Sequence, residues 1–155
     1  MNLNKAGVTL IELVAVLAIV GMLSVLAIPS IQNMLENQQL NADAAKLALV
    51  LRSARQTAIS AEKAQVVEFI SATKRYRLNY DANYYFGDNV AYSAVIGFSP
   101  ATPNGPPACI FLPSGAPSKG GTIAIANRQG KLKYIIINPV AGRVRVSDSP
   151  PSSWD

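Results

Sequence analysis

A long apolar run opens the chain, and it contains a single charged side chain. The run covers residues 8–28, and its only charge is that of Glu12. A helix needs about 20 consecutive apolar residues to cross the hydrocarbon core of a bilayer, so the pattern predicts a transmembrane helix. A secretory signal peptide is the alternative, but the run is longer than the apolar part of such a peptide and no small-residue cleavage site follows it.

The helical pattern continues beyond the apolar run with a different periodicity. Residues 30–39 are mostly polar, and from Leu40 apolar residues return at alternating intervals of four and three positions, which places them on one stripe of an amphipathic helix. The stripe consists of Leu40, Ala44, Leu47, Leu51, Ala54, Ala58 and Ala61. We therefore predict one helix from residue 8 to about residue 61. Its alanines allow the C-terminal half to approach a sheet closely, and its N-terminal half is free to pack elsewhere.

After Glu62 the periodicity changes to two, which is typical of strands. We predict strands at residues 65–70, 75–80, 84–86, 92–98, 109–112, 121–126, 131–138 and 143–147. The first two form a hairpin, and the apolar run at 131–138 indicates burial on both faces. Residues 79–89 are predicted to be a surface loop, and the proline-rich residues 99–107 cannot form a central strand. One long helix followed by short strands indicates an α+β domain.

Glu12 needs a partner if it lies inside a membrane. A charge at that depth costs at least a few kcal/mol, and the apolar run contains no basic side chain. If the chain is cut between Gly7 and Val8, the new α-amino group lies about one helical turn from Glu12. That amine could neutralise the carboxylate in its own subunit or in a neighbouring one.

The residues around this position match a known processing site. The sequence G-V-T-L-I-E-L at residues 7–13 resembles the prepilin-peptidase site of type IV pilins and type II secretion pseudopilins, which reads G-F-T-L-I-E. The resemblance implies cleavage after Gly7, N-methylation of Val8 and a role for Glu12 in assembly. The sequence departs from the family at Val8, where Phe is usual.

Two further residues of the N-terminal helix match the pilin family. Pro29 cannot donate a hydrogen bond to the carbonyl of Val25, and Gly21 costs about 1 kcal/mol of helix propensity relative to Ala. Their positions match the helix-breaking Gly and Pro of pilins, which bracket a segment that unwinds in assembled filaments. The resemblance implies that this segment melts on assembly, and a static kink is the alternative.

Four segments in the C-terminal half resemble particular groups within the pilin family. The segments F-L-P-S-G, G-G-T-I-A-I, K-Y-I-I-I-N and G-R-V-R-V occur in this order. They resemble the domain shared by the H-type minor pseudopilin of type II secretion and the FimT-type minor pilins. The fold that this implies is a long N-terminal helix, first transmembrane and then amphipathic, packed on antiparallel β-sheets.

The resemblance divides the chain into five segments. They are a prepilin leader at 1–7, the transmembrane and assembly half of the helix at 8–29, its amphipathic half at 30–61, a β-rich globular pseudopilin domain at 62–147 and a flexible tail at 148–155. The implied location is the bacterial inner membrane, crossed once with the globular domain on the periplasmic side, and later a pilus or pseudopilus. The implied partners are prepilin peptidase and, through the N-terminal helix, other pilins or pseudopilins.

Little in the composition supports catalysis. The chain has no His, which removes the usual general base and the commonest zinc ligand. Its single cysteine, Cys109, cannot form an intrachain disulfide and lies in an apolar run that predicts burial. Asp81 and Asp88 flank an aromatic loop but lack the alternating acids of a calcium loop. We therefore expect no enzyme, no cofactor and no metal site.

The charge is unevenly distributed along the chain. The formal net charge is +5, and no Asp or Glu occurs between Asp88 and Asp148. Six basic residues fall in that interval: Lys119, Arg128, Lys131, Lys133, Arg143 and Arg145. This distribution favours a positive surface that attracts polyanions, and a solvated face that keeps the domain soluble is the alternative.

One basic motif suggests a specific partner. In a strand, Arg143 and Arg145 lie on one face, where they could contact successive phosphates together with Lys131 and Lys133 of the preceding strand if the hairpin register brings them together. FimT-type pilins implicated in DNA uptake carry a G-R-x-R motif here, which this sequence matches from Gly142 to Arg145. The alternative is an ordinary edge strand whose charged side chains prevent it from pairing with another chain.

Three functions remain open on these grounds. The chain is expected to be a structural minor subunit, either of the type II secretion pseudopilus or of a type IV pilus, which would support protein secretion or pilus assembly. The alternative is a FimT-like minor pilin that binds extracellular DNA for uptake in natural transformation.

Overall fold

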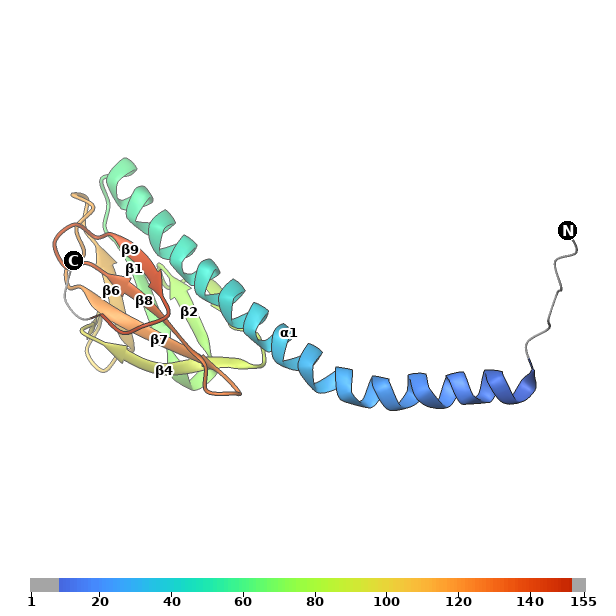
Figure 1. Cartoon of the computed structure of the whole chain (residues 1–155). Helices are drawn as coiled ribbons and strands as arrows, with labels where there is room; N and C mark the ends of the chain where they lie inside the picture. Colours follow the sequence, from blue (N-terminus) through green and yellow to red (C-terminus); the bar gives the residue numbers. More distant parts are fainter. Residues whose placement is uncertain (1–8, 152–155) are drawn as a thin grey trace, which may run out of the picture. The chain divides into compact units, whose positions relative to one another are not determined.

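The computed structural model describes residues 9–151, apart from the side chains of residues 25–30. Its first element is helix α1 (Leu10–Ser60), which confirms the predicted long helix over this range (Figure 1). Gly7, Val8 and the rest of the leader lie outside the described residues, as does the end of the tail at residues 152–155. Within the part of the chain that is described, no helix combines the length and hydropathy that crossing a membrane requires. The span at residues 8–28 therefore stays a prediction.

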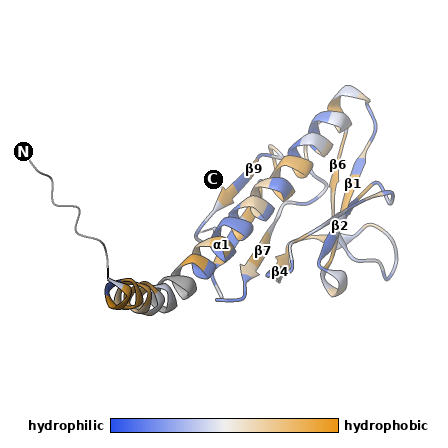
Figure 2. Cartoon of the chain, turned by 90° about the vertical axis from the view of Figure 1, so that its right-hand side faces the viewer, coloured by the Kyte–Doolittle hydropathy of each residue, from blue (hydrophilic) through white to orange (hydrophobic). Residues whose placement is uncertain are grey.

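The chain divides into two compact units, Met1–Leu35 and Glu36–Asp155. In the first unit, α1 begins after Thr9, whose hydroxyl accepts a hydrogen bond of 3.3 Å from the backbone N–H of Glu12. This is the geometry of an N-cap, and the acidic side chain of Glu12 in the first turn favours the same helix start through the helix dipole. The apolar character of these turns is visible in Figure 2.

The second unit contains α1 from residue 36 and two antiparallel sheets. The five strands of sheet A, in spatial order, are β3 (Ala82–Tyr85), β2 (Arg75–Leu78), β1 (Gln65–Ile70), β6 (Pro107–Phe111) and β5 (Ser99–Pro100). The four strands of sheet B are β4 (Val90–Ile96), β7 (Gly121–Asn127), β8 (Leu132–Ile137) and β9 (Val144–Ser147). The expected α+β fold, with a long helix on antiparallel sheets, is confirmed.

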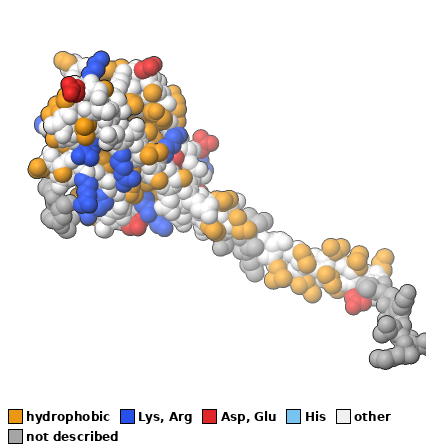
Figure 3. Space-filling model, turned by 90° about the horizontal axis from the view of Figure 1, so that it is seen from above, with side chains coloured by type: hydrophobic (Ala, Val, Ile, Leu, Met, Phe, Trp, Pro, Cys, Tyr) orange, Lys and Arg blue, Asp and Glu red, His pale blue; other side chains and the backbone are white. Residues whose placement is uncertain are grey.

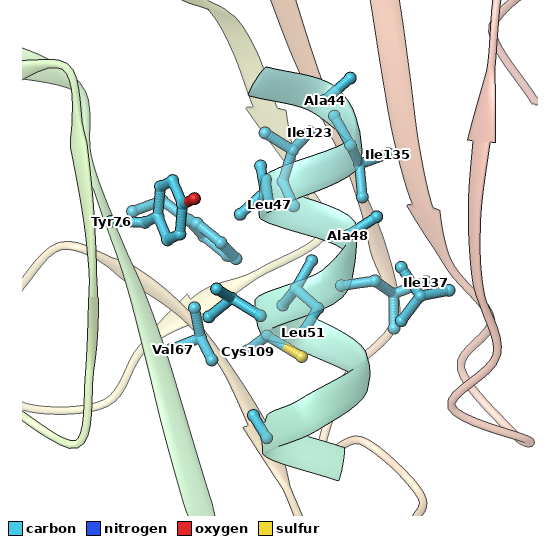
Figure 4. Packing of buried hydrophobic residues seen from close by; sticks show 14 of the residues in the cluster. Ala44, Leu47, Ala48, Leu51, Val67, Tyr76, Cys109, Ile123, Ile135 and Ile137 are labelled. Atoms are coloured by element: carbon cyan, nitrogen blue, oxygen red, sulfur yellow. The ribbon is translucent and has the colours of Figure 1, made fainter. Parts of the chain in front are cut away.

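The core of this unit lies between α1 and the inner faces of both sheets. The predicted stripe is buried from Leu40 to Ala58, whereas Ala61 lies beyond the end of α1 and is exposed. Figure 4 shows the helix side chains reaching residues of sheet A on one side and of sheet B on the other. The labelled members are Ala44, Leu47, Ala48 and Leu51 of α1, Val67, Tyr76 and Cys109 of sheet A, and Ile123, Ile135 and Ile137 of sheet B.

The predicted hairpin forms, with η1 (Ser71–Thr73) at its turn and Ile70 paired with Arg75. Its second strand ends at Leu78, earlier than predicted, because Asn79 and Tyr80 adopt positive φ angles of 50° and 64° that a strand cannot contain. The predicted surface loop at 79–89 is wrong in part, since it contains β3, which begins two residues and ends one residue before the strand predicted at 84–86.

The other strand predictions agree with the structure within a few residues. The proline-rich stretch contributes only the two-residue β5, which is an edge strand, as the missing proline N–H groups require. Three consecutive residues of β8, Ile135, Ile136 and Ile137, are buried. Burial on both faces is thus confirmed for the C-terminal half of β8.

Candidate functional sites

The first candidate site is the N-terminal part of α1, where every described side chain from Leu10 to Ser24 is exposed. Its large apolar side chains are exposed at consecutive positions, so that they point in every direction around the helix axis. Leu10 is 83% exposed, Ile11 75% and Met22 73%. A helix that is apolar all round is stable only inside a bilayer or among other chains. This segment therefore needs a partner that the unit itself does not supply.

Glu12 lies in the first turn of this helix and is exposed. None of the basic side chains in the described part of the chain forms a salt bridge with it. The proposed partner, an amine at Val8, lies outside the described residues. Gly21 and Pro29 both lie within the bounds of α1, and a Cβ atom at Gly21 would have nothing within 4 Å.

The second candidate site is the basic end of β9. Arg145 is paired with Ile136 on β8, while the neighbouring Val144 is 7% exposed and belongs to the core. The carbonyl of Arg143 accepts a hydrogen bond of 3.0 Å from the backbone N–H of Asn138, two positions beyond Ile136. Arg143 and Arg145 therefore lie on one face of sheet B, away from the core, and both are exposed.

The register separates the two lysines from these arginines. Lys133 is paired with the buried Ile125 and therefore lies on the core side of β8, where its ammonium forms a salt bridge with Asp148. The hydrogen bond from Lys133 and its positive charge lower the pKa of the Asp148 carboxyl. Lys131 lies in the β7–β8 turn, at the end of β8 remote from Arg143. The structure thus brings together the two arginines and leaves the two lysines elsewhere.

Two helix residues that the sequence did not single out lie beside Arg143. Arg52 and Arg55 of α1 line a cleft of about 530 Å³ together with Ala141, Gly142, Arg143 and Val144. Arg52 donates from Nη2 to the carbonyl of Val144 at 3.1 Å, and Arg55 donates from Nε to the carbonyl of Gly115 at 2.9 Å. Their spacing of three positions places both on one helix face, which was the signal available in the sequence.

The remaining reactive groups, one thiol and two phenols, pack in the interior of the domain. Cys109 is fully buried, and burial raises the pKa of its thiol to about 12. Burial also raises the pKa values of Tyr76 and Tyr92. Among the described residues, no three His, Cys, Asp or Glu side chains gather into a possible metal site. The chemistry that these sites offer is binding through apolar and basic surfaces.

Comparison with known proteins gives a match at the N-terminus. Residues 2–28 match the prokaryotic N-terminal methylation motif. The matched stretch includes Gly7, Val8, Glu12 and Gly21. No curated protein matches the sequence.

Solved structures resemble the whole domain. The type IV minor pilin FimU of Pseudomonas aeruginosa strain PAO1 is similar in two crystal forms, both at 17% identity. In the P21 form the TM-score is 0.58, with 77% of this chain and 98% of FimU covered. In the P65 form the TM-score is 0.55, with 75% and 100% covered.

The minor pseudopilin EpsH from the type II secretion system of Vibrio cholerae is also similar, with 13% identity and a TM-score of 0.55 over 70% of this chain and 96% of EpsH. At these identities the likeness shows the fold. The chain thus combines a prokaryotic N-terminal methylation motif at residues 2–28 with the fold of type IV minor pilins and minor pseudopilins.

Proposed function

We propose that the protein is a structural minor subunit of a type IV pilus or of a type II secretion pseudopilus, and that it has no catalytic activity. The observation that carries this proposal is the methylation motif, which leads directly into a helix whose apolar side chains are exposed all round. Such a helix requires either lipid or neighbouring helices, and a filament core of packed helices provides the second environment.

Processing prepares this helix for assembly. Prepilin peptidase removes residues 1–7, and the new first residue, Val8, is methylated. Before assembly, the subunit lies in the inner membrane, which residues 8–28 cross, with its globular unit on the periplasmic side. The amine of Val8 in a neighbouring subunit then pairs with Glu12 in the apolar filament core, where an unpaired carboxylate would be costly. Unwinding between Gly21 and Pro29 accompanies this transfer.

Mass spectrometry and filament counting test the proposal together. The chain is expressed with a complete pilus or pseudopilus assembly system, and the mature protein is expected to begin at N-methylated Val8. The Glu12→Gln variant should be processed equally well yet enter filaments at about one tenth of the normal level or less, because it loses a charge pair in an apolar setting. Glu62→Gln, which changes an exposed acid beyond the end of α1, is the matched control.

Two results would contradict the proposal. An N-terminus that remains at Met1 would show that the motif is not processed, and normal incorporation of Glu12→Gln would remove the proposed pairing. The secretion role and the pilus role are separated by expressing the chain in two kinds of cell, one that lacks a minor pseudopilin and one that lacks a minor pilin. Protein secretion should recover in the first if the chain is a pseudopilin, and pilus assembly in the second if it is a pilin.

A second candidate function is the binding of extracellular DNA. It is favoured by the exposure of Arg143 and Arg145 on one face of sheet B, where neither forms a salt bridge with a described carboxylate. Two guanidinium groups at this spacing contact phosphates without reading base sequence. In a gel shift at low salt, Arg143→Ala/Arg145→Ala should bind DNA at least about tenfold more weakly.

The double variant Lys131→Ala/Lys133→Ala is the matched control, since it removes the same charge from the β7–β8 turn and the start of β8, which the register separates from the arginines. It should retain most of the binding. Equal losses in both variants would indicate that overall charge, and not the arginine pair, determines the affinity.

A further inference from the structure

The arginine cleft joins the basic end of β9 to helix α1. Arg143 belongs to both surfaces, because it lines the cleft with Arg52 and Arg55 and lies on the same sheet face as Arg145. The basic surface therefore extends from the sheet to the helix. Figure 3 shows one face of the second unit, where Lys and Arg side chains gather while Asp and Glu lie mainly at the margins.

The two helix arginines are held in place by the backbone. The contacts to the carbonyls of Val144 and Gly115 each use one N–H of a guanidinium group that carries several. The other N–H groups stay available, and their directions are restrained by the contact already made. A planar donor group that is fixed in this way loses less side-chain entropy when it binds an anion than a free lysine does.

The cleft holds uncompensated positive charge. In the described residues, the salt bridges join Arg77 to Glu68 and Lys133 to Asp148, so none of the three cleft arginines is paired with a carboxylate. Three cations around one cleft of about 530 Å³ repel one another and attract an anion with several oxygens. Guanidinium forks match phosphate oxygens through paired hydrogen bonds.

We propose that Arg52, Arg55 and Arg143 bind the backbone phosphates of a DNA strand, which then continues to Arg145. This inference rests on the second candidate function and assigns to it two helix residues outside the G-R-x-R motif. It is independent of filament assembly, because the cleft lies entirely within the second unit. The contacts are to phosphates, so the cleft holds DNA irrespective of sequence.

The test measures the affinity of the full-length chain, purified in a nonionic detergent, for a fluorescein-labelled DNA duplex. Fluorescence anisotropy is recorded between about 50 and 200 mM salt, and the logarithm of the association constant is plotted against that of the salt concentration. Each lost phosphate contact reduces the slope of this plot by about 0.9. Arg52→Gln/Arg55→Gln should therefore reduce it by about 1.8 and weaken binding at least about tenfold.

Two further double variants distinguish the loss of a phosphate contact from a general loss of positive charge or of folded protein. Lys46→Gln/Arg128→Gln removes the same charge from exposed positions outside the cleft, and should leave the slope within about 0.5 of that of the unaltered chain. Arg52→Lys/Arg55→Lys retains both charges and should restore most of the slope. Partial unfolding lowers the fraction of protein that can bind DNA. It does not lower the slope in the Gln pair and restore it in the Lys pair.

The possible failures are distinguishable. If Arg52→Gln/Arg55→Gln has the same slope as the control pair, the cleft is not a phosphate site, while binding at Arg143 and Arg145 stands. If the unaltered chain does not bind the duplex at the lowest salt, the second candidate function and the cleft proposal are both wrong. Neither result affects the proposed assembly role.

Discussion

Glu68 is an acidic residue buried in the middle of sheet A, and one neighbour makes this possible. Its side chain is 2% exposed, and its carboxylate accepts a hydrogen bond of 2.8 Å from Nε of Arg77 and forms a salt bridge of 2.7 Å with Nη2 of the same guanidinium. Arg77 is its cross-strand partner on β2. Loss of one member of a buried pair is costly because it leaves the other charge without compensation.

We expect Arg77→Ala to lower the free energy of unfolding by about 3 kcal/mol. Chemical denaturation monitored by circular dichroism measures the change, with the exposed turn residue Arg128→Ala as control at less than about 0.5 kcal/mol. Adding Glu68→Gln to Arg77→Ala should recover part of the loss, since the buried charge is then gone. A loss below about 1 kcal/mol for Arg77→Ala would mean that water already compensates Glu68.

Cys109 allows a second test of a single residue. Because burial raises the pKa of its thiol to about 12, the reactive thiolate is almost absent from the folded protein near neutral pH and forms only as the pH approaches that value. Iodoacetamide at about pH 8 should leave the native chain unmodified and alkylate it fully in denaturant, as followed by mass spectrometry. Rapid alkylation of the native chain would contradict the burial of β6.

Single residues also show where sequence reasoning succeeds and where it ends. The burial of Cys109 could be predicted because its neighbours in the run are apolar. The burial of Glu68 could not, because its partner depends on the register between β1 and β2. Asp43 lies off the apolar stripe of α1, yet it is 5% exposed because its carboxylate accepts a hydrogen bond of 2.9 Å from the backbone N–H of Gly87.

At the scale of elements, α1 depends on small residues where it meets the sheets. Ala44, Ala48, Ala54 and Ala58 are each at most 1% exposed, so there is no room for a larger side chain at these positions. The 3.6-residue periodicity predicted the burial of Ala44, Ala54 and Ala58, because burial of a helix stripe follows from spacing, but the predicted stripe did not include Ala48.

Ala48→Leu should therefore destabilise the protein by about 1–3 kcal/mol through overpacking. Ala45→Leu is the matched control, since Ala45 lies on the same helix but is exposed, and it should change stability by less than about 0.5 kcal/mol. Thermal unfolding of both variants gives the comparison. Equal effects would show that helix propensity, and not packing, governs this position.

The strands were predicted less accurately than the helix, for a physical reason. Their positions follow from alternation, but their ends depend on local backbone conformation. The positive φ angles of Asn79 and Tyr80 terminate β2, and they cannot be predicted from the periodicity of R-Y-R-L-N-Y. Similarly, β3 lies in a polar loop-like sequence because Tyr84 stacks on Tyr76, with ring centres 5.3 Å apart.

At the scale of the whole molecule, the basic cleft depends on contacts between distant parts of the chain. Arg52 and Val144 are 92 positions apart, and only the packing of α1 against the sheets brings them together. The sequence indicated a basic C-terminal third, but it gave no indication that a helix contributes to the same surface. The lysines at 131 and 133 illustrate the converse, since proximity in sequence did not bring them to the arginine face.

The division into two units leads to the last prediction. Every member of the buried core cluster lies at or after Leu40, and Asn37 accepts a hydrogen bond of 3.2 Å from the side-chain amide of Asn127 at the end of β7. A chain of residues 36–155 should therefore have a free energy of unfolding within about 0.5 kcal/mol of that of the full chain in the same detergent. A chain that begins at residue 46 loses Leu40, Asp43 and Ala44 from the core, which removes several of the roughly 5–15 kcal/mol that stabilise a domain. Circular dichroism should show a cooperative transition for the first truncation and a greatly lowered or absent one for the second. If the shorter deletion already abolishes the transition, the N-terminal half of α1 is part of the domain and not a separate assembly segment.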